Sequence, residues 1–229
     1  MKEYYFQYGD REIDYLKSRD RRLSEVIDQV GIIRRRVIPD IFAALVHSII
    51  GQQISTKTHE SIWGKTVELL GSVSPENILA ISPEELHSVG LSFRKVEYIR
   101  DAARRFASGE YDADCLNSLN DEEIVEKLSQ LKGVGIWSAE MLMLFSMQRP
   151  DVLSFGDLAI LRGLRMIYHH RHIDRKLFEK YRRRFSPYNS VASLYIWAVA
   201  GGAIDGMKYY APKSPKKKPN QGQTHVKSL

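Results

Sequence analysis

A glycine turn, a tryptophan and an aspartate are spaced so that they could act on one anionic substrate. Gly133 and Gly135 lead straight into an apolar, helix-forming run, and Trp137 stands where that run begins. Such a turn could bind phosphate, because it exposes backbone N–H groups and the positive end of a helix dipole. Turns of this kind also serve only to reverse chain direction. Asp157, at the expected start of the next helix, could be a reactive carboxylate facing the turn or an ordinary helix cap.

Helical periodicity runs through nearly all of the chain and strand signals are scarce, so we expect an all-α fold. Ser74 and Ser82 each precede a proline, which is typical of a helix cap followed by the first helical position. Ser82 and Glu85 also have the spacing of a capping box. A long helix should end at Gly109, and the residues before Pro39 read as helical. Further helices are expected over residues 41–50, 55–70, 136–147, 157–168, 174–184 and 188–200.

Composition limits the class of protein. The formal net charge is +6 over 229 residues, and the lysine-rich stretch 212–229, which carries no acid, should be a disordered basic tail. Cys115 is the only cysteine, which excludes a disulfide within the chain, a four-cysteine zinc site and an iron–sulfur cluster. No apolar run is long enough to span a bilayer and the N-terminus does not resemble a signal peptide, so we expect an intracellular protein without membrane contact.

Five segments together resemble one family. The segments are VHSIIGQQISTKTHESIWGKTVELLG (46–71), GLSFRKVEYIRDAA (90–103), LKGVGIWSAEML (131–142), GDLAILRGL (156–164) and SLYIWAVAGG (193–202). In this order and at this spacing they resemble the helix-hairpin-helix base-excision DNA glycosylases. Within that superfamily the chain is most similar to the alkylation-repair branch, the DNA-3-methyladenine glycosylase II type.

The resemblance implies that Asp157 is the catalytic carboxylate. Its task would be cleavage of an N-glycosidic bond, during which the sugar develops positive charge as the base leaves. A carboxylate near the anomeric carbon can stabilise that charge and orient or deprotonate the attacking water. An alkylated purine is already cationic and leaves readily, which suits a single essential aspartate.

The resemblance also implies a base pocket. Trp137 stands where bifunctional members of the superfamily carry a lysine nucleophile, so a monofunctional enzyme is expected, and Lys132 is given no covalent role. Trp137 would form one wall of the pocket and Trp197 the opposite wall, two aromatic faces suited to a flat, cationic, flipped-out base. Met141 and Leu158 would complete the pocket with aliphatic surface.

For DNA binding, the resemblance places the N–H groups of Gly133 and Gly135, with Ser138, against phosphate. Gln52 and Gln53 occupy a turn between two helices from which Gln53 would enter the gap left by the flipped nucleotide. A polar turn residue without that role is the alternative interpretation of Gln53. No cofactor is required, but the family holds a monovalent cation, Na⁺ or K⁺, on hairpin carbonyls. The matching carbonyls are those of Ser129, Leu131 and Val134.

Two helical lobes with a base-binding cleft between them are expected, in a more compact form than the longer bacterial relatives. Residues 1–40 would form a helical segment that packs with the C-terminal lobe. Residues 41–148 would form the lobe that contains the helix-hairpin-helix at about 121–147. Residues 149–211 would form the C-terminal lobe with the catalytic aspartate.

The predicted function is that of a monomeric, monofunctional DNA glycosylase that removes alkylated purines from double-stranded DNA in base excision repair. It would work wherever the cell keeps its DNA. Three alternatives remain: a bifunctional glycosylase and lyase for other damaged bases, a helical protein–protein adaptor, and a non-catalytic helix-hairpin-helix DNA-binding module. Asp157 distinguishes the last, because a binding module has no need of a carboxylate beside phosphate. The range of lesions is open.

Overall fold

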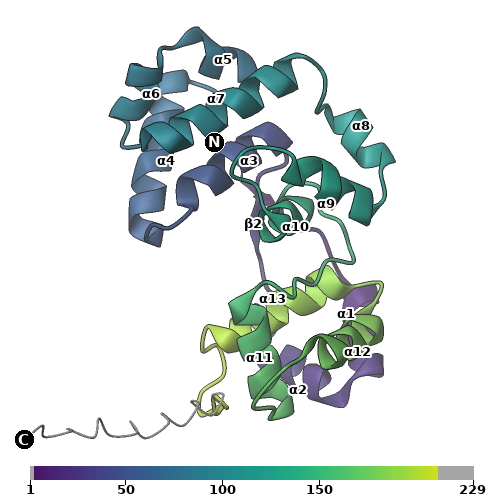
Figure 1. Ribbon diagram of the computed structural model, residues 1–229. Coiled ribbons are helices and arrows are strands. Elements are labelled where there is room, and N and C mark those ends of the chain that lie inside the picture. The colour runs from purple at the N-terminus through teal and green to yellow at the C-terminus, as the bar shows by residue number, and fades with distance from the viewer. Residues whose placement is uncertain (1–2, 211–229) are drawn as a thin grey trace, which may run out of the picture.

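The computed structural model describes residues 3–210 and shows two groups of helices joined by extended segments (Figure 1). The predicted disordered tail, residues 212–229, lies outside the described residues. One group contains α3 (Ile41–Gly51), α4 (Thr56–Leu70), α5 (Pro75–Ala80), α6 (Pro83–Ser88), α7 (Phe93–Ala107), α8 (Ala113–Ser118), α9 (Asp121–Ser129) and α10 (Ile136–Phe145). The other contains α1 (Asp10–Arg19), α2 (Arg21–Val30), α11 (Leu158–Tyr168), α12 (Arg175–Phe185) and α13 (Asn189–Ala200).

The fold is all-α, as predicted, and the capping motifs place the helix starts. Ser82 and Glu85 exchange hydrogen bonds between side chain and backbone at the start of α6, which confirms the predicted capping box. Ser74 likewise accepts a backbone hydrogen bond at the start of α5. Within residues 3–210, no helix is both long and apolar enough to cross a bilayer.

The N-terminal segment differs in part from its helical prediction. It contains α1 and α2, but also a two-stranded antiparallel ribbon of β1 (Tyr4–Tyr5) and β2 (Arg36–Val37). Strands of two residues are too short for an alternating pattern to show, and their pairing joins the two ends of the segment. The short helix α8 also has no counterpart among the predicted helices.

The group of α1, α2, α11, α12 and α13 is held together by close helix packing. Helices α1 and α2 lie against α11, α12 and α13, so the N-terminal segment packs with C-terminal helices. Gly163 on α11 allows the closest approach, because a Cβ there would stand 2.3 Å from the carbonyl oxygen of Ile196 on α13. This packing fixes α11, whose first turn carries Asp157 as its cap.

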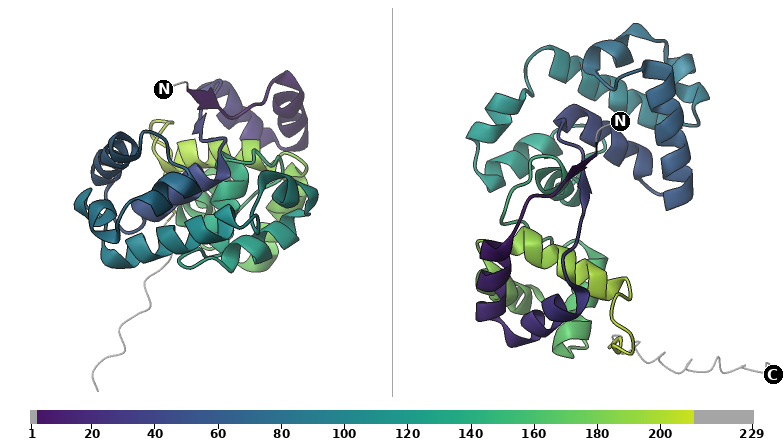
Figure 2. Two further views of the ribbon diagram at one scale, coloured as in Figure 1. Left: turned by 90° about the horizontal axis from the view of Figure 1, so that it is seen from above. Right: turned by 180° about the vertical axis from the view of Figure 1, so that it is seen from behind.

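Extended segments connect the two groups side by side (Figure 2). The chain enters the α3–α10 group just after β2 and leaves it just after α10. There the backbone N–H of Ile38 donates to the carbonyl oxygen of Phe145 at 3.0 Å, and the Ser146 hydroxyl donates to the carbonyl of Pro39 at 3.3 Å. Entry and exit are therefore adjacent.

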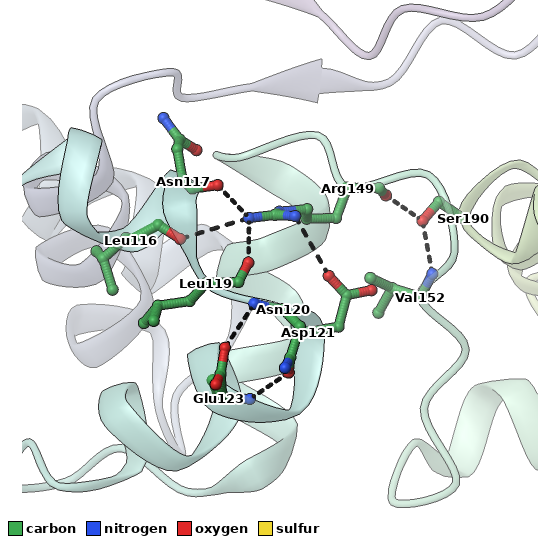
Figure 3. A network of polar contacts seen from close by, with 9 residues as sticks. All are labelled: Leu116, Asn117, Leu119, Asn120, Asp121, Glu123, Arg149, Val152 and Ser190. Atoms are coloured by element: carbon green, nitrogen blue, oxygen red, sulfur yellow. Dashed lines mark hydrogen bonds and ion pairs between the residues drawn. The ribbon is translucent and has the colours of Figure 1, made fainter.

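Arg149 anchors the segment that leaves this group (Figure 3). Its Nη2 donates to three carbonyl oxygens around the end of α8, those of Leu116, Asn117 and Leu119, at 3.4, 3.2 and 3.0 Å. Its Nη1 lies 3.6 Å from the carboxylate of Asp121 at the start of α9. Its own carbonyl accepts from the Ser190 hydroxyl on α13 at 2.5 Å. One residue thus links α8, α9 and α13, and the chain reaches Asp157 from a fixed point.

Candidate active site

Asp157 is held by three hydrogen bonds. Its Oδ1 accepts from the backbone N–H groups of Ala159 and Ile160, at 2.8 and 3.0 Å, in the manner of a helix cap. Its Oδ2 accepts from the indole Nε1–H of Trp137 at 2.9 Å. The residue is only 8 % exposed. Asp157 therefore is the cap of α11, and it is also tied to the hairpin helix α10 by its second oxygen.

Trp137 lies in the first turn of α10 and remains 45 % exposed. The backbone at Gly156 passes close to the Cβ atom of Trp137, since a Cβ on that glycine would stand 3.8 Å from it. The residue is not a fully buried core aromatic. Part of its surface is free for a ligand while its nitrogen is engaged with Asp157.

A second contact ties the loop before α11 to the same helix. The hydroxyl of Ser154 donates to the carboxylate of Glu140, which follows Trp137 by three positions and so lies near it along α10. Burial raises the pKa of Glu140 above its ordinary value, and the Ser154 hydrogen bond opposes that shift. The sequence did not predict a role for Glu140, because no local pattern indicates that its side chain bonds to the loop before α11.

The two hairpin glycines differ in backbone conformation and in the space around them. Gly133 has φ +79°, and a Cβ there would meet the ring of Tyr98 at 2.3 Å. Gly135 has φ −101° and ψ 177°, an extended conformation open to any residue, and nothing lies within 4 Å of its Cβ position. Gly133 is thus required by the fold. Gly135 instead leaves open space at the start of α10, where a ligand could approach the backbone.

The turn between α3 and α4 lies against the hairpin. The side chain of Gln52 donates to the carbonyl oxygen of Gly133 at 2.8 Å. Lys95 Nζ, on α7, donates to the carbonyls of Ile50 and Gln52, each at 2.8 Å. Gln53 is exposed and left-handed, with φ +60°. Gln52 therefore fixes the turn, and Gln53 is exposed on it; the role of Gln53 as a wedge stays a prediction.

This turn and the hairpin together line a cavity of about 520 Å³. It is lined by Ser48, Gly51, Gln52, Gln53, His59, Gly133, Trp137 and Ser138. All of these residues belong to the α3–α10 group, so this cavity does not test the predicted cleft between the lobes. Ser48 and His59 were missed by the sequence reasoning, and only their place in the segment 46–71 could have suggested them. Ser138 lines the cavity but is largely buried, so little of it is exposed to solvent.

The other predicted pocket residues are more scattered. Met141 is buried in α10, whereas Leu158, directly after Asp157, is 80 % exposed. Trp197 on α13 stacks on Phe145 at the far end of α10, with ring centroids 5.5 Å apart. Among the described residues no ring contact joins Trp137 and Trp197. The pairing of these two tryptophans across a bound base stays a prediction.

The hairpin carbonyls predicted to hold a cation have unused hydrogen-bonding capacity. The carbonyl of Leu131 accepts one hydrogen bond, from the N–H of Val134 at 3.1 Å, and an oxygen of this kind has a second lone pair. In residues 3–210 no backbone N–H donates to the carbonyls of Ser129 and Val134. No group of histidine, cysteine, aspartate or glutamate side chains in this range could hold a metal ion. Any cation here would therefore rest on backbone oxygens.

Comparisons with known proteins point to one family. The family described as HhH-GPD superfamily base excision DNA repair protein matches residues 46–187. The chain is 30 % identical to DNA-3-methyladenine glycosylase 1 of Schizosaccharomyces pombe, over 86 % of this chain and 87 % of that protein. It is also 30 % identical to the DNA-3-methyladenine glycosylase of Saccharomyces cerevisiae, over 74 % and 70 % of the two chains.

Solved structures agree. A DNA-3-methyladenine glycosidase from Bacillus halodurans superposes with a TM-score of 0.78 and 34 % identity, over 92 % of this chain and 97 % of that one. The Schizosaccharomyces pombe 3-methyladenine DNA glycosylase, solved with abasic DNA, superposes with a TM-score of 0.72 and 26 % identity, over 83 % and 97 %.

Proposed function

The chain belongs to the HhH-GPD superfamily of base excision DNA repair proteins, and on this premise we propose that it is a monofunctional DNA glycosylase for alkylated purines. The observation that carries the proposal is Asp157, a carboxylate fixed at the start of α11 beside the partly exposed ring of Trp137. The substrate is double-stranded DNA with a damaged base of the 3-methyladenine type, and the enzyme acts as a monomer wherever DNA is kept.

The reaction needs one carboxylate and a water molecule. The bond between C1′ and the base nitrogen breaks with its electron pair going to the base, so a cationic alkylpurine leaves as a neutral molecule. Asp157 stabilises the positive charge that develops on the sugar. Water then forms the new bond to C1′ and gives up a proton to the carboxylate or to solvent. No amine stands at position 137, so no covalent imine forms and the DNA strand stays intact.

DNA is held by the elements around the cavity. The open start of α10 at Gly135 offers backbone N–H groups and the helix dipole to a phosphate. Gln53 enters the duplex from the α3–α4 turn and fills the space of the extruded nucleotide. The carbonyls of Ser129, Leu131 and Val134 would hold a monovalent cation, which strengthens the electrostatic attraction of the hairpin for phosphate.

The first test is release of free bases from methylated duplex DNA by the wild type and by Asp157→Asn, with product strands separated before and after alkali. We expect methylpurine release by the wild type, strand breaks only after alkali, and a variant that binds DNA but is inactive. The matched control is Asp174→Asn. Asp174 caps α12 in the same way, through a 2.8 Å bond from Leu177, and should keep full activity.

Each other outcome has a definite meaning. Breaks before alkali would show lyase chemistry and favour a bifunctional enzyme. No base release from any lesion by a wild type that binds DNA would favour the binding module. Equal activity of Asp157→Asn and Asp174→Asn would show that Asp157 is only a helix cap, because asparagine caps helices as well as aspartate does.

A further inference from the structure

We propose that Trp137 is a positioning residue, whose indole N–H holds the carboxylate of Asp157 in its working orientation. This role is separate from any stacking of its ring on a base. The inference rests on the proposed function, because it assumes that Asp157 faces the sugar. It gives a reason for a half-exposed tryptophan at the start of a helix, where packing alone does not require one.

The two oxygens of Asp157 are held by different parts of the molecule. Oδ1 is fixed by α11 itself, through the N–H groups of Ala159 and Ile160. Those two bonds hold one oxygen, and a bond to Oδ2 is needed to hold the plane of the carboxylate from its other side as well. In residues 3–210 the only hydrogen-bond donor to Oδ2 is the indole of Trp137, at 2.9 Å. The direction of the second oxygen therefore depends on that one donor.

Trp137 is itself well placed to act as a fixed donor. Its indole donates to Asp157, and Glu140, three positions along α10, accepts from Ser154 in the same segment before α11. Helix α10 thus holds the loop before α11 at two points. A shift of the loop would have to break both contacts, so the N–H and the carboxylate keep their relative positions.

One side chain then serves two purposes that can be separated by substitution. The exposed part of the ring can contact a base, while the N–H fixes the carboxylate. Trp137→Phe removes the N–H and keeps an aromatic face, though a smaller one. Replacement of Trp137 by benzothienylalanine, in which sulfur stands in place of the N–H, keeps the full bicyclic ring and removes only the donor.

The experiment uses two duplexes with abasic-site analogues, besides single-turnover excision of a methylated purine. One duplex carries a pyrrolidine analogue, whose protonated ring nitrogen resembles the charged sugar. The other carries the neutral tetrahydrofuran analogue. For both variants we expect excision to slow by about tenfold to a hundredfold, as for a lost hydrogen bond to a charged group. Preference for the cationic analogue should fall similarly, while affinity for the neutral one changes by less than about threefold.

Controls separate this inference from the proposed function. Trp63→Phe makes the same change at a tryptophan in α4 that packs against His47, and it should match the wild type. Asp157→Asn should abolish the preference for the cationic analogue. If it does so while both Trp137 variants keep the preference and the rate, the positioning role is wrong and the proposed function stands.

Two further outcomes are also decisive. If Asp157→Asn keeps the preference, Asp157 does not face the sugar and the proposed function itself fails. If Trp137→Phe is slow but the benzothienylalanine variant is as fast as the wild type, Trp137 acts only through ring contact and the inference is overturned. Thermal melting of every variant shows that rates are compared among folded proteins.

Discussion

At the scale of single residues, capping of α11 leaves Asp157 able to take the catalytic role that we propose for it. A cap needs one acceptor oxygen, and Oδ1 supplies it to the first turn of α11. The second oxygen, Oδ2, takes no part in the cap and accepts from Trp137 instead. Capping also makes the carboxylate rigid with respect to a helix that is itself packed tightly on α13 at Gly163. The local role thus supports the functional one.

The hairpin glycines give a residue-scale prediction in the form of a matched pair. Gly133→Ala should lower the free energy of unfolding by about 1–3 kcal/mol, because the new Cβ meets Tyr98 at 2.3 Å and φ is +79°. Gly135→Ala should fold as the wild type does. It should weaken duplex binding by about fivefold, since a methyl group would keep phosphate from the backbone. Urea unfolding and fluorescence anisotropy measure the two effects.

The opposite pattern would contradict this assignment. A Gly135→Ala variant that loses stability but binds DNA normally would mean that the open space at Gly135 has no ligand. A Gly133→Ala variant of wild-type stability would mean that the Tyr98 ring moves away at no cost.

At the scale of elements, α7 supports both parts of the proposed DNA-binding surface. Lys95 holds the α3–α4 turn by two carbonyls, and Tyr98, three positions later, lies under Gly133 of the hairpin. Burial lowers the pKa of Lys95 below its ordinary value. Gln52 then joins the turn to the hairpin directly. Helix α7 and the side-chain amide of Gln52 thereby set the spacing between the proposed wedge and the proposed phosphate site.

The element-scale prediction concerns that amide. Gln52→Ala should cost only about 1 kcal/mol of stability, as for a single hydrogen bond, because α7 still supports both partners. The excision rate should fall by about tenfold, because the proposed wedge and the proposed phosphate site are then no longer held at a fixed spacing. Gln29→Ala, at an exposed position of α2, is the control. Unchanged excision by Gln52→Ala, measured under single-turnover conditions, would show that the two elements act independently.

The capping motifs explain how much of the fold the sequence could predict. Ser82 and Glu85 interact within a single turn, so their pattern predicts the start of α6 by itself. The link from Gln52 to Gly133 spans 81 residues, and that from Trp137 to Asp157 spans 20. Such contacts depend on how helices pack, which no local pattern encodes. The resemblance therefore assigned roles to Trp137 and Asp157, which stay predictions, but it did not indicate that Trp137 donates to Asp157.

At the scale of the whole molecule, His47 should make stability depend on pH. Burial, with His59 and Arg35 nearby, lowers the pKa of His47 from 6.5 to about 4. Above pH 6.5 the ring is neutral in both the folded and the unfolded chain, so His47 does not make the free energy of unfolding depend on pH. Between pH 6.5 and 4 the unfolded chain takes up the proton and the folded protein does not. The free energy of unfolding should then fall by up to about 3 kcal/mol.

His47→Phe tests this assignment, because phenylalanine keeps an aromatic ring beside Trp63 and cannot take up a proton. Relative to the wild type, the variant should gain stability as the pH falls from 6.5 to 4, with no further gain below that. Urea unfolding at several pH values measures the difference. Profiles of wild type and variant that run parallel across this range would show that His47 does not contribute.

The adjacent entry and exit of the α3–α10 group bear on how the chain is made. Helix α2 ends at Val30, but its partner α11 begins only at Leu158. At about 5–20 residues per second, a ribosome needs on the order of ten seconds to cover that interval. The intervening group can fold as soon as it emerges, whereas α1 and α2 must wait with their apolar faces uncovered. Helices α1 and α2 are thus synthesised before the α3–α10 group but packed after it, and in the interval their apolar faces are open to a chaperone.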